Sequence, residues 1–549
     1  MKTPGTATAA YGAAGARRQT NASEMSPDSR IYIPSITSQE ILDENSQSQK
    51  NRFTNKPKRG MNRKLLIFLV VVVVAVAGAI VAVVVTKDSG SKSASNESGN
   101  SGSSTTNNSN KSSTSGTSSS KSSKTSSGNS TSSGSDGNAK VYSDPTTGKY
   151  PLTAFAIGDW GQTVAVNDSC CQRRKGKFNG YDWHAEAGVN KLMDLEAANN
   201  KPKVVLSHGD NFYWTGIQGT KDQAYRFELT FEERHKTEAM IDVPWINVMG
   251  NHDYGGGSYI CVDDNEEMVA CNSADEVKAA MKKRFELQQS YKSPHENRWI
   301  LTDHFYKYSV EEGDVSMDIF NLDMNDAESH GANEICCQCY SYAEGNDTSC
   351  KTITRGMKLC CGGDTSIYDA CVGQFKEWGE EAMTKLVSEV KKSKATWKIV
   401  NSHYSPYGHY GETSGKKWLE TLEGLGVQLW IAGHTHGEKH DYASWGMHFV
   451  ENGAGGGIQS ESASGIPPWA TALSNLWVAP GFSDGGNNYG FFSIQASEEW
   501  MKVRFMTFDD NWSLTTTGSS LADSKIGGVT AKWCYYIPAD GSKGQKCEE

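Results

Sequence analysis

Five short clusters of residue types that bind metals or transfer protons lie between Gly158 and His436 of this 549-residue chain. Each cluster follows an apolar run of strand length and is rich in Asp, Asn or His. The runs and clusters are LTAFAI before Gly158-Asp159-Trp160-Gly161, KVVLS before His208 to Tyr213, WINVM before Gly250 to Asp253, WKIV before Asn401 to His403, and VQLWIA before Gly433 to His436. One such cluster is weak evidence, because most Gly-Asp turns are only turns and most His-x-His pairs are structural. Five clusters in this order leave little room for coincidence.

Segments of helical composition separate several of these runs, as in His184 to Asn199 and Gln374 to Lys392. Continuous apolar strands that alternate with helices are typical of an α/β layered domain whose strands are covered on both faces. Ligands of such domains gather beyond the carboxyl ends of the strands. We therefore expect the five clusters to converge on one site.

The expected site brings together two Asp, one Tyr, one Asn and three His. These residues are Asp159, Asp210, Tyr213, Asn251, His403, His434 and His436. Seven ligands are too many for one tetrahedral zinc ion. The set suits two metals of borderline or hard character that share a bridging carboxylate. Glycines that precede key residues would give metal and substrate close access to the backbone.

The clusters resemble the five-block signature of purple acid phosphatases, which belong to the calcineurin-like metallophosphoesterases. The matching blocks are GDWG, GDNFY, GNHD, VNSH and GHTH, and the longer stretches GDNFYWTG and HYSPYG are similar to the mammalian-type branch, the tartrate-resistant acid phosphatases. The likeness covers roughly Leu152 to Thr517. It implies an α/β metallophosphoesterase fold, a layered β-sandwich flanked by helices.

The same resemblance implies an acid phosphatase with a dinuclear centre. Fe(III) would be held by Asp159, Asp210, Tyr213 and His436, and a divalent Fe, Zn or Mn by Asn251, His403 and His434, with Asp210 bridging the two ions. Metal-bound hydroxide would then attack a phosphate monoester. Two cations suit this reaction because they supply a nucleophile at acid pH and neutralise charge on the transferring oxygens.

Three further residues are candidates for catalysis. His252 is the best candidate to give the leaving group its proton, and Asp253 would either orient that histidine or cap the turn. His409, six residues after His403, is either a second histidine that faces the substrate or a surface residue, because its spacing departs from the family pattern. His208 is expected to be a strand-end residue and not a ligand.

All 13 cysteines lie after residue 140, and seven of them fall in a Cys-rich insertion, residues 330–371, that departs from the family. A disulfide-stapled loop is favoured there over a metal-binding ribbon. Adjacent cysteines should bond to different partners, because vicinal bridges are strained. Cys261 with Cys271 and Cys534 with Cys547 are expected local pairs. The odd total predicts one free thiol or a disulfide to a second chain.

The first 140 residues have a different composition. Residues 65–85 are 21 apolar residues without a charge, enough for a helix of about 30 Å, and are expected to be a signal anchor and not a cleaved signal peptide or a buried core helix. The basic flank before them predicts a cytosolic N-terminus, with the catalytic domain outside the cell or in the lumen of the secretory or vacuolar system. Residues 1–64 are expected to be a disordered tail, and the Ser-rich residues 86–140 a flexible linker.

The remaining residues, 141–549, are expected to form the catalytic domain. They hold 37 basic and 56 acidic residues, which argues against a nucleic-acid partner. Sequons at Asn167, Asn346 and Asn511 are candidate glycan sites on the exterior side. Two alternatives stay open: a metallophosphodiesterase on the same fold, against which Tyr213 stands, and an inactive membrane-anchored binding module, against which the complete ligand set stands.

Overall fold

The computed structural model describes residues 142–162, 173–174, 177–340, 350–480, 488–515 and 521–548. All of them belong to one compact unit, Ser126–Glu549. The expected tail, anchor and linker, at 1–64, 65–85 and 86–140, lie outside the described residues. Within the described ranges, none of the helices has the length and apolar character that a membrane span requires.

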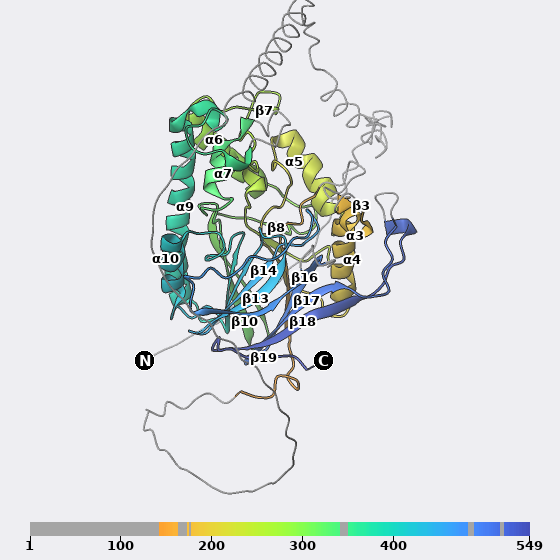
Figure 1. Ribbon diagram of the computed structural model, residues 1–549. Coiled ribbons are helices and arrows are strands. Elements are labelled where there is room, and N and C mark those ends of the chain that lie inside the picture. The colour runs from red at the N-terminus through yellow and green to blue at the C-terminus, as the bar shows by residue number, and fades with distance from the viewer. Residues whose placement is uncertain are drawn as a thin grey trace, which may run out of the picture. The chain divides into compact units, whose positions relative to one another are not determined.

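Two large β-sheets form the centre of this unit (Figure 1). The first has eight strands in the order β19 (Gln545–Lys546), β18 (Val529–Pro538), β17 (Trp500–Phe508), β16 (Gly490–Ala496), β1 (Leu152–Ile157), β4 (Val204–Ser207), β5 (Trp245–Asn247) and β8 (Trp299–Ile300). The second has seven, in the order β15 (Leu473–Val478), β13 (Glu438–Ala443), β14 (Met447–Asn452), β12 (Leu429–Ala432), β11 (Trp397–Ser402), β10 (Val315–Leu322) and β9 (Phe305–Glu312). Two short pairs are separate: β2 (Arg173–Arg174) with β3 (Lys177–Phe178), and β6 (Cys261–Val262) with β7 (Met268–Val269).

The five apolar runs expected to be strands are β1, β4, β5, β11 and β12. In the first sheet, β1 pairs in parallel with β4, and β4 with β5. In the second sheet, β11 pairs in parallel with β12. The carboxyl ends of each parallel group therefore point to one edge of their sheet, which is the arrangement that the sequence predicted.

The two sheets pack against each other as a sandwich, and the alternation of side chains along β1 shows how. Ala154 and Ala156 belong to the core between the sheets, together with Ile399 of β11. The intervening Phe155 and Ile157 face the other way and pack with residues of helix α4 (Ala185–Ala197). Both faces of the strand are thus covered, as its unbroken apolar sequence indicated.

Helices cover the outer faces of both sheets. Figure 1 shows α9 (Thr365–Lys392) and α10 (Glu412–Leu422) on one side of the sandwich and α4 on the other. Leu386 of α9 and Trp418 of α10 pack in one apolar cluster with Trp430 of the second sheet. The remaining helical segments are α3 (Gly180–Trp183), α5 (Thr220–Arg226), the π-helical η1 (Phe227–Glu232), η2 (His252–Tyr254), α6 (Ala274–Gln289), α7 (Ala332–Cys337), η3 (Cys350–Thr352), η4 (Cys361–Gly363) and η6 (Leu521–Asp523).

Disulfides staple the Cys-rich insertion, as predicted. The described bridges are Cys261–Cys271, Cys336–Cys371, Cys337–Cys360, Cys339–Cys350 and Cys534–Cys547. Both expected local pairs are confirmed, and the neighbours Cys336 and Cys337 bond to different partners. Cys361 is free and buried, so its thiol cannot reach a second chain in the folded protein. Cys170 and Cys171 lie outside the described residues.

Candidate metal centre

The loops after β1, β4 and β11 bring three ligand-type side chains into one buried group. Asp159, Asp210 and His403 each place one ligand atom so that all three atoms lie within 4.8 Å of one another. All three residues have no exposed surface. The sandwich therefore brings the strand ends of its two sheets to a common point, and the other four predicted ligands surround that point.

Asn251, His403 and His434 form one half of the group. Nδ1 of His403 donates to the carbonyl oxygen of His208 at 2.7 Å, so its Nε2 carries the lone pair. That Nε2 lies 3.0 Å from Oδ1 of Asn251 and 3.2 Å from Nδ1 of His434, which is itself 3.0 Å from the same Asn251 oxygen. Three electron-pair donors converge here, which is the donor set of a divalent cation such as Zn, Fe or Mn.

Asp159, Tyr213 and His436 form the other half. The Tyr213 hydroxyl donates to Oδ1 of Asp159 at 3.0 Å, and Nε2 of His436 lies 3.6 Å from the same oxygen. Nδ1 of His436 faces Glu461 at 3.3 Å, which leaves Nε2 for the centre. This half is richer in anionic oxygen and therefore suits a harder, more highly charged cation.

Asp210 stands between the two halves. Its Oδ1 accepts the backbone N–H of His252 at 2.9 Å and lies 3.5 Å from Nε2 of His403. Its Oδ2 is buried and has no hydrogen-bond donor among the described residues, since Tyr213 gives its single proton to Asp159. A buried carboxylate oxygen without a partner is costly. This orphaned atom fits a carboxylate that bridges two metal ions.

The electrostatics of the group also favour bound cations. Burial, with the adjacent Asp210 carboxylate, raises the pKa of Asp159 well above its ordinary value. Burial and the same two carboxylates raise the pKa of Tyr213 well above its ordinary value. Anionic ligands held this close together out of water need positive charge to stay ionised. The residues present thus fit a dinuclear metal centre.

The backbone of these loops explains why glycines accompany the ligands. Asp159, Asp210 and His434 have φ values of 55°, 51° and 67°, in the left-handed region that allows a sharp turn directly after a strand. A Cβ at Gly250 would lie 2.2 Å from Oδ1 of Asp210, and one at Gly433 would lie 2.4 Å from Oδ2 of Asp159. A side chain at either position would force the neighbouring carboxylate or the loop to shift.

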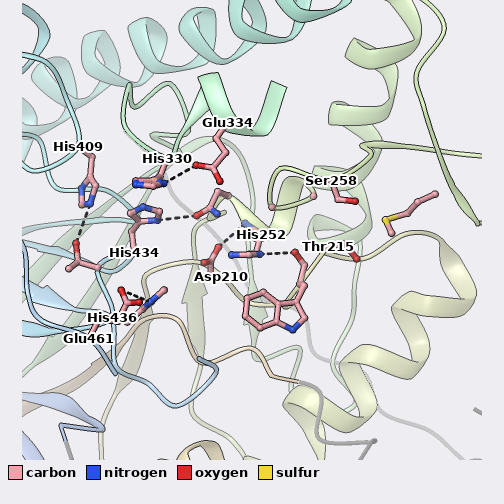
Figure 2. Close-up of a pocket in the computed structure, with 16 residues that line it drawn as sticks. Asp210, Thr215, His252, Ser258, His330, Glu334, His409, His434, His436 and Glu461 are labelled. Carbon is pink, nitrogen blue, oxygen red and sulfur yellow. Dashed lines mark hydrogen bonds and ion pairs between the residues drawn. The ribbon is translucent and has the colours of Figure 1, made fainter. Parts of the chain in front are cut away.

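A cavity of about 800 Å³ opens onto this group, and His252 lines it (Figure 2). Nδ1 of His252 contacts the carbonyl oxygen of Trp214 at 2.7 Å, so this nitrogen carries a proton. Nε2 is then the ring nitrogen left for a ligand in the cavity. The ring can act as the predicted proton donor when Nε2 also carries a proton.

Asp253 does not serve as an orienting partner of His252 in this structure. Its carboxylate accepts the backbone N–H groups of Asn211, Phe212 and Gly250 at 3.1, 3.1 and 2.8 Å, and the amide of Gln288 at 2.9 Å. Burial and the charge of Asp210 raise the pKa of Asp253 to about 7. Of the two predicted roles, the turn-capping one fits: Asp253 ties the loop after β4 to the loop after β5.

His409 lines the cavity and is buried, so the surface alternative does not hold. The backbone N–H of Ser405 donates to its Nδ1 at 3.2 Å, and its Nε2 lies 3.2 Å from the Thr435 hydroxyl. Burial and the neighbouring His403 lower the pKa of His409 to about 3. The ring is therefore neutral at ordinary pH, with its proton on Nε2. His208, as expected, contributes its carbonyl and not a ligand atom.

Three titratable residues that line the cavity were not predicted from the sequence: His330, Glu334 and Glu461. Figure 2 shows His330 and Glu334 in contact beside His434, and Glu461 beside His436. They lie outside the five strand-end clusters: His330 and Glu461 are in loops, and Glu334 is in the short helix α7. The only sequence signal for the first two is their position at the start of the Cys-rich insertion.

The sequence pattern of the calcineurin-like phosphoesterase family matches residues 153–438, which is more than half of the chain and includes all five clusters. Purple acid phosphatase 17 of Arabidopsis thaliana is 24% identical over 327 residues, covering 58% of this chain and 73% of that protein. Tartrate-resistant acid phosphatase type 5 of Oryctolagus cuniculus is 23% identical over 315 residues, covering 56% and 74%. A solved purple acid phosphatase, PPD1 from yellow lupin, aligns with 14% identity and a TM-score of 0.33 over 69% of this chain and 53% of that one. The chain therefore belongs to the calcineurin-like phosphoesterase family, and purple acid phosphatases are among its homologues.

Proposed function

We propose that this protein is an acid phosphatase that hydrolyses phosphate monoesters at an Fe(III)–M(II) centre, where M is Fe, Zn or Mn. The observation that carries the proposal is the position of Tyr213, whose hydroxyl lies 3.0 Å from Oδ1 of Asp159 at the edge of the buried carboxylate pair. A phenolate is a hard anionic ligand that suits ferric iron. The half formed by Asn251, His403 and His434 has the softer, neutral donors of a divalent site.

When bound, the two cations would supply charge neutralisation for the transferring phosphoryl group and a water of lowered pKa. Residues of the chain itself would handle the proton and bind the substrate. With Nδ1 fixed on the Trp214 carbonyl, His252 in its doubly protonated form would give the Nε2 proton to the departing alkoxide. His409, kept neutral by burial, donates from Nε2 to the Thr435 hydroxyl at the cavity wall without adding a charge.

The direct test is metal analysis together with a visible absorption spectrum of the purified protein. We expect iron plus a second metal, and an absorption band from iron tyrosinate that disappears in Tyr213→Phe. Activity is then compared on p-nitrophenyl phosphate and bis(p-nitrophenyl) phosphate between pH 4 and 7. A colourless protein that prefers the diester would identify the phosphodiesterase alternative, and a metal-loaded protein inactive on both esters would identify a binding module.

We also propose that residues 65–85 anchor the chain in a membrane, with residues 1–64 in the cytosol and the phosphatase domain outside the cell or in a secretory or vacuolar lumen. The basic flank before the apolar segment supports this orientation. The disulfides of the described domain support an oxidising compartment. Epitope tags at the two ends, probed by protease protection of sealed membranes, test it: cleavage of the C-terminal tag from the cytosolic side would contradict the proposal.

A further inference from the structure

The Cys-rich insertion contributes a charged pair to the wall of the candidate active site. Nδ1 of His330 lies 2.8 Å from a carboxylate oxygen of Glu334, one helical turn further along the chain. Both residues line the cavity, and both side chains are partly open to it, with 64% and 43% of their surfaces exposed. Figure 2 shows the contact between them next to His434.

The fold holds this pair in place from two sides. The Tyr404 hydroxyl, directly after His403, donates to the carbonyl oxygen of His330 at 3.0 Å. Helix α7, which carries Glu334, is linked at its end to α9 and to the loop before it through Cys336–Cys371 and Cys337–Cys360. The insertion is thus a braced element and places these side chains reproducibly against the metal-binding loops.

The geometry defines which ring atom of His330 is free. Because Nδ1 donates to Glu334, Nε2 is the remaining nitrogen. The His330 ring centre lies 5.8 Å from that of His434, a predicted ligand of the divalent ion.

The rest of the cavity offers few groups that could bind a phosphoryl oxygen. None of the described residues that line it is lysine or arginine. Beyond His434 and His436, which are predicted ligands, His252, His330 and His409 offer imidazole nitrogens there, and Trp214 offers an indole N–H. A phosphate monoester carries oxygens that two metal ions cannot all satisfy, so the remaining oxygens need donors from the protein.

We propose that His330 is a substrate-binding residue whose Nε2 forms a hydrogen bond with a phosphoryl oxygen, and that Glu334 is a positioning residue that holds its ring. This inference rests on the proposed phosphatase function of the same site. It gives the insertion a role: the disulfides brace a substrate contact that lies outside the five strand-end clusters. Inorganic phosphate, the product, should use the same contact.

The test compares the full-length protein in detergent with His330→Ala, His330→Phe, His330→Gln and Glu334→Gln. His295→Ala, a histidine outside the cavity, is the matched control. We expect His330→Ala and His330→Phe to raise KM for p-nitrophenyl phosphate, and the calorimetric Kd of inorganic phosphate, by about tenfold, the loss of one hydrogen bond to a charged group. Metal content and kcat should stay close to wild type. His330→Gln, which keeps a donor, should recover part of the affinity.

Glu334→Gln should give a smaller rise in Kd, since an amide oxygen still accepts from Nδ1. The double variant with His330→Ala should bind phosphate no more weakly than His330→Ala alone, because Glu334 acts through the ring. If His330→Ala or His330→Phe fails to fold, the other of these two variants is measured. An unchanged phosphate Kd in the folded variant overturns the inference. That result would not contradict the phosphatase function, because the wild-type protein would still hydrolyse monoesters. A wild-type protein without monoesterase activity would contradict the proposed function itself.

Discussion

The carbonyl oxygen of His208, at the end of β4, accepts a hydrogen bond from Nδ1 of His403, at the end of β11, over 2.7 Å. This single contact joins the first sheet to the second at the candidate metal centre. It also sets the tautomer of His403, so that Nε2 faces Asn251 and Asp210. The sandwich therefore does more than bring ligands together: backbone atoms of one sheet orient the ligands of the other.

Replacing single ligands should show which residues hold which metal. Asp210→Ala should lose both metals, because Asp210 lies between the halves, and activity should fall by more than about 1000-fold, beyond the loss of one electrostatic contact. His403→Ala should lose the divalent metal and keep most of the iron. Elemental analysis of each purified variant measures this. Equal loss of both metals in His403→Ala would contradict the assignment of His403 to the divalent half alone.

The glycine at position 250 offers a second test that changes no ligand. A Cβ there would lie 2.2 Å from Oδ1 of Asp210 and 2.8 Å from Cε1 of His403. We expect Gly250→Ala to weaken metal binding by about 10- to 100-fold, as for other changes that disorient ligands. Gly373→Ala, in α9 where a Cβ meets nothing within 4 Å, is the control and should bind metal normally. Metal titrations followed by calorimetry give both affinities, and a normal affinity in Gly250→Ala would show that the loop can shift without cost.

The ligand set was predictable from the sequence because each ligand follows closely on the end of an apolar strand, and strand ends meet in a layered α/β fold. The role of Asp253 was not. Its position next to His252 left two roles open, orienting that ring or capping the turn. Both residues lie in the 3-10 turn η2, however, where successive side chains diverge by about a third of a turn, so one lines the cavity and the other points into the core.

The positions of side chains in the Cys-rich insertion were also not predictable from the sequence. Cysteine spacing predicted a stapled loop and two local pairs, but not that the stapling places His330 and Glu334 in the cavity, because that depends on packing against distant residues such as Tyr404. The start of α9 was also missed. Asp364 caps the backbone N–H groups of Ser366 and Ile367, so the helix begins nine residues before the expected Gln374.

A buried pair of histidines should make the fold sensitive to acid. Nε2 of His440 contacts Nδ1 of His448 at 2.9 Å, and Trp533 donates to the other nitrogen of His440 at 3.0 Å. Burial lowers the pKa of His448 to about 4, against about 6.5 in the unfolded chain. Between these values the unfolded state binds more protons, so the free energy of unfolding rises with pH. Through this one residue, the free energy of unfolding should decrease by about 3 kcal/mol as pH falls from 6.5 to 4.

Urea unfolding of wild type and His448→Gln at pH 4.5, 5.5 and 7 measures this effect. We expect the free energy of unfolding to fall more steeply at low pH in the wild type than in the variant. The difference between the two slopes should correspond to close to one proton taken up on unfolding. The variant should be the less stable protein at pH 7, because the hydrogen bond to the Ser542 carbonyl is weakened. Parallel slopes in the two proteins would mean that His448 is not the acid-sensitive group.

The last prediction separates the proton donor from the metal centre. His252→Ala removes the ring whose Nδ1 rests on the Trp214 carbonyl, but it leaves the backbone N–H that Asp210 accepts at 2.9 Å, so both metals should remain. An alkoxide leaving group needs a proton, whereas p-nitrophenolate departs without one. Alkyl phosphates should therefore slow by about 10²- to 10⁴-fold, the usual contribution of a general acid, and p-nitrophenyl phosphate far less. A plot of log kcat/KM against leaving-group pKa should steepen in the variant. If every ester slowed equally, His252 would have to act on the phosphoryl group itself, and the leaving-group proton would have to come from another residue of the cavity.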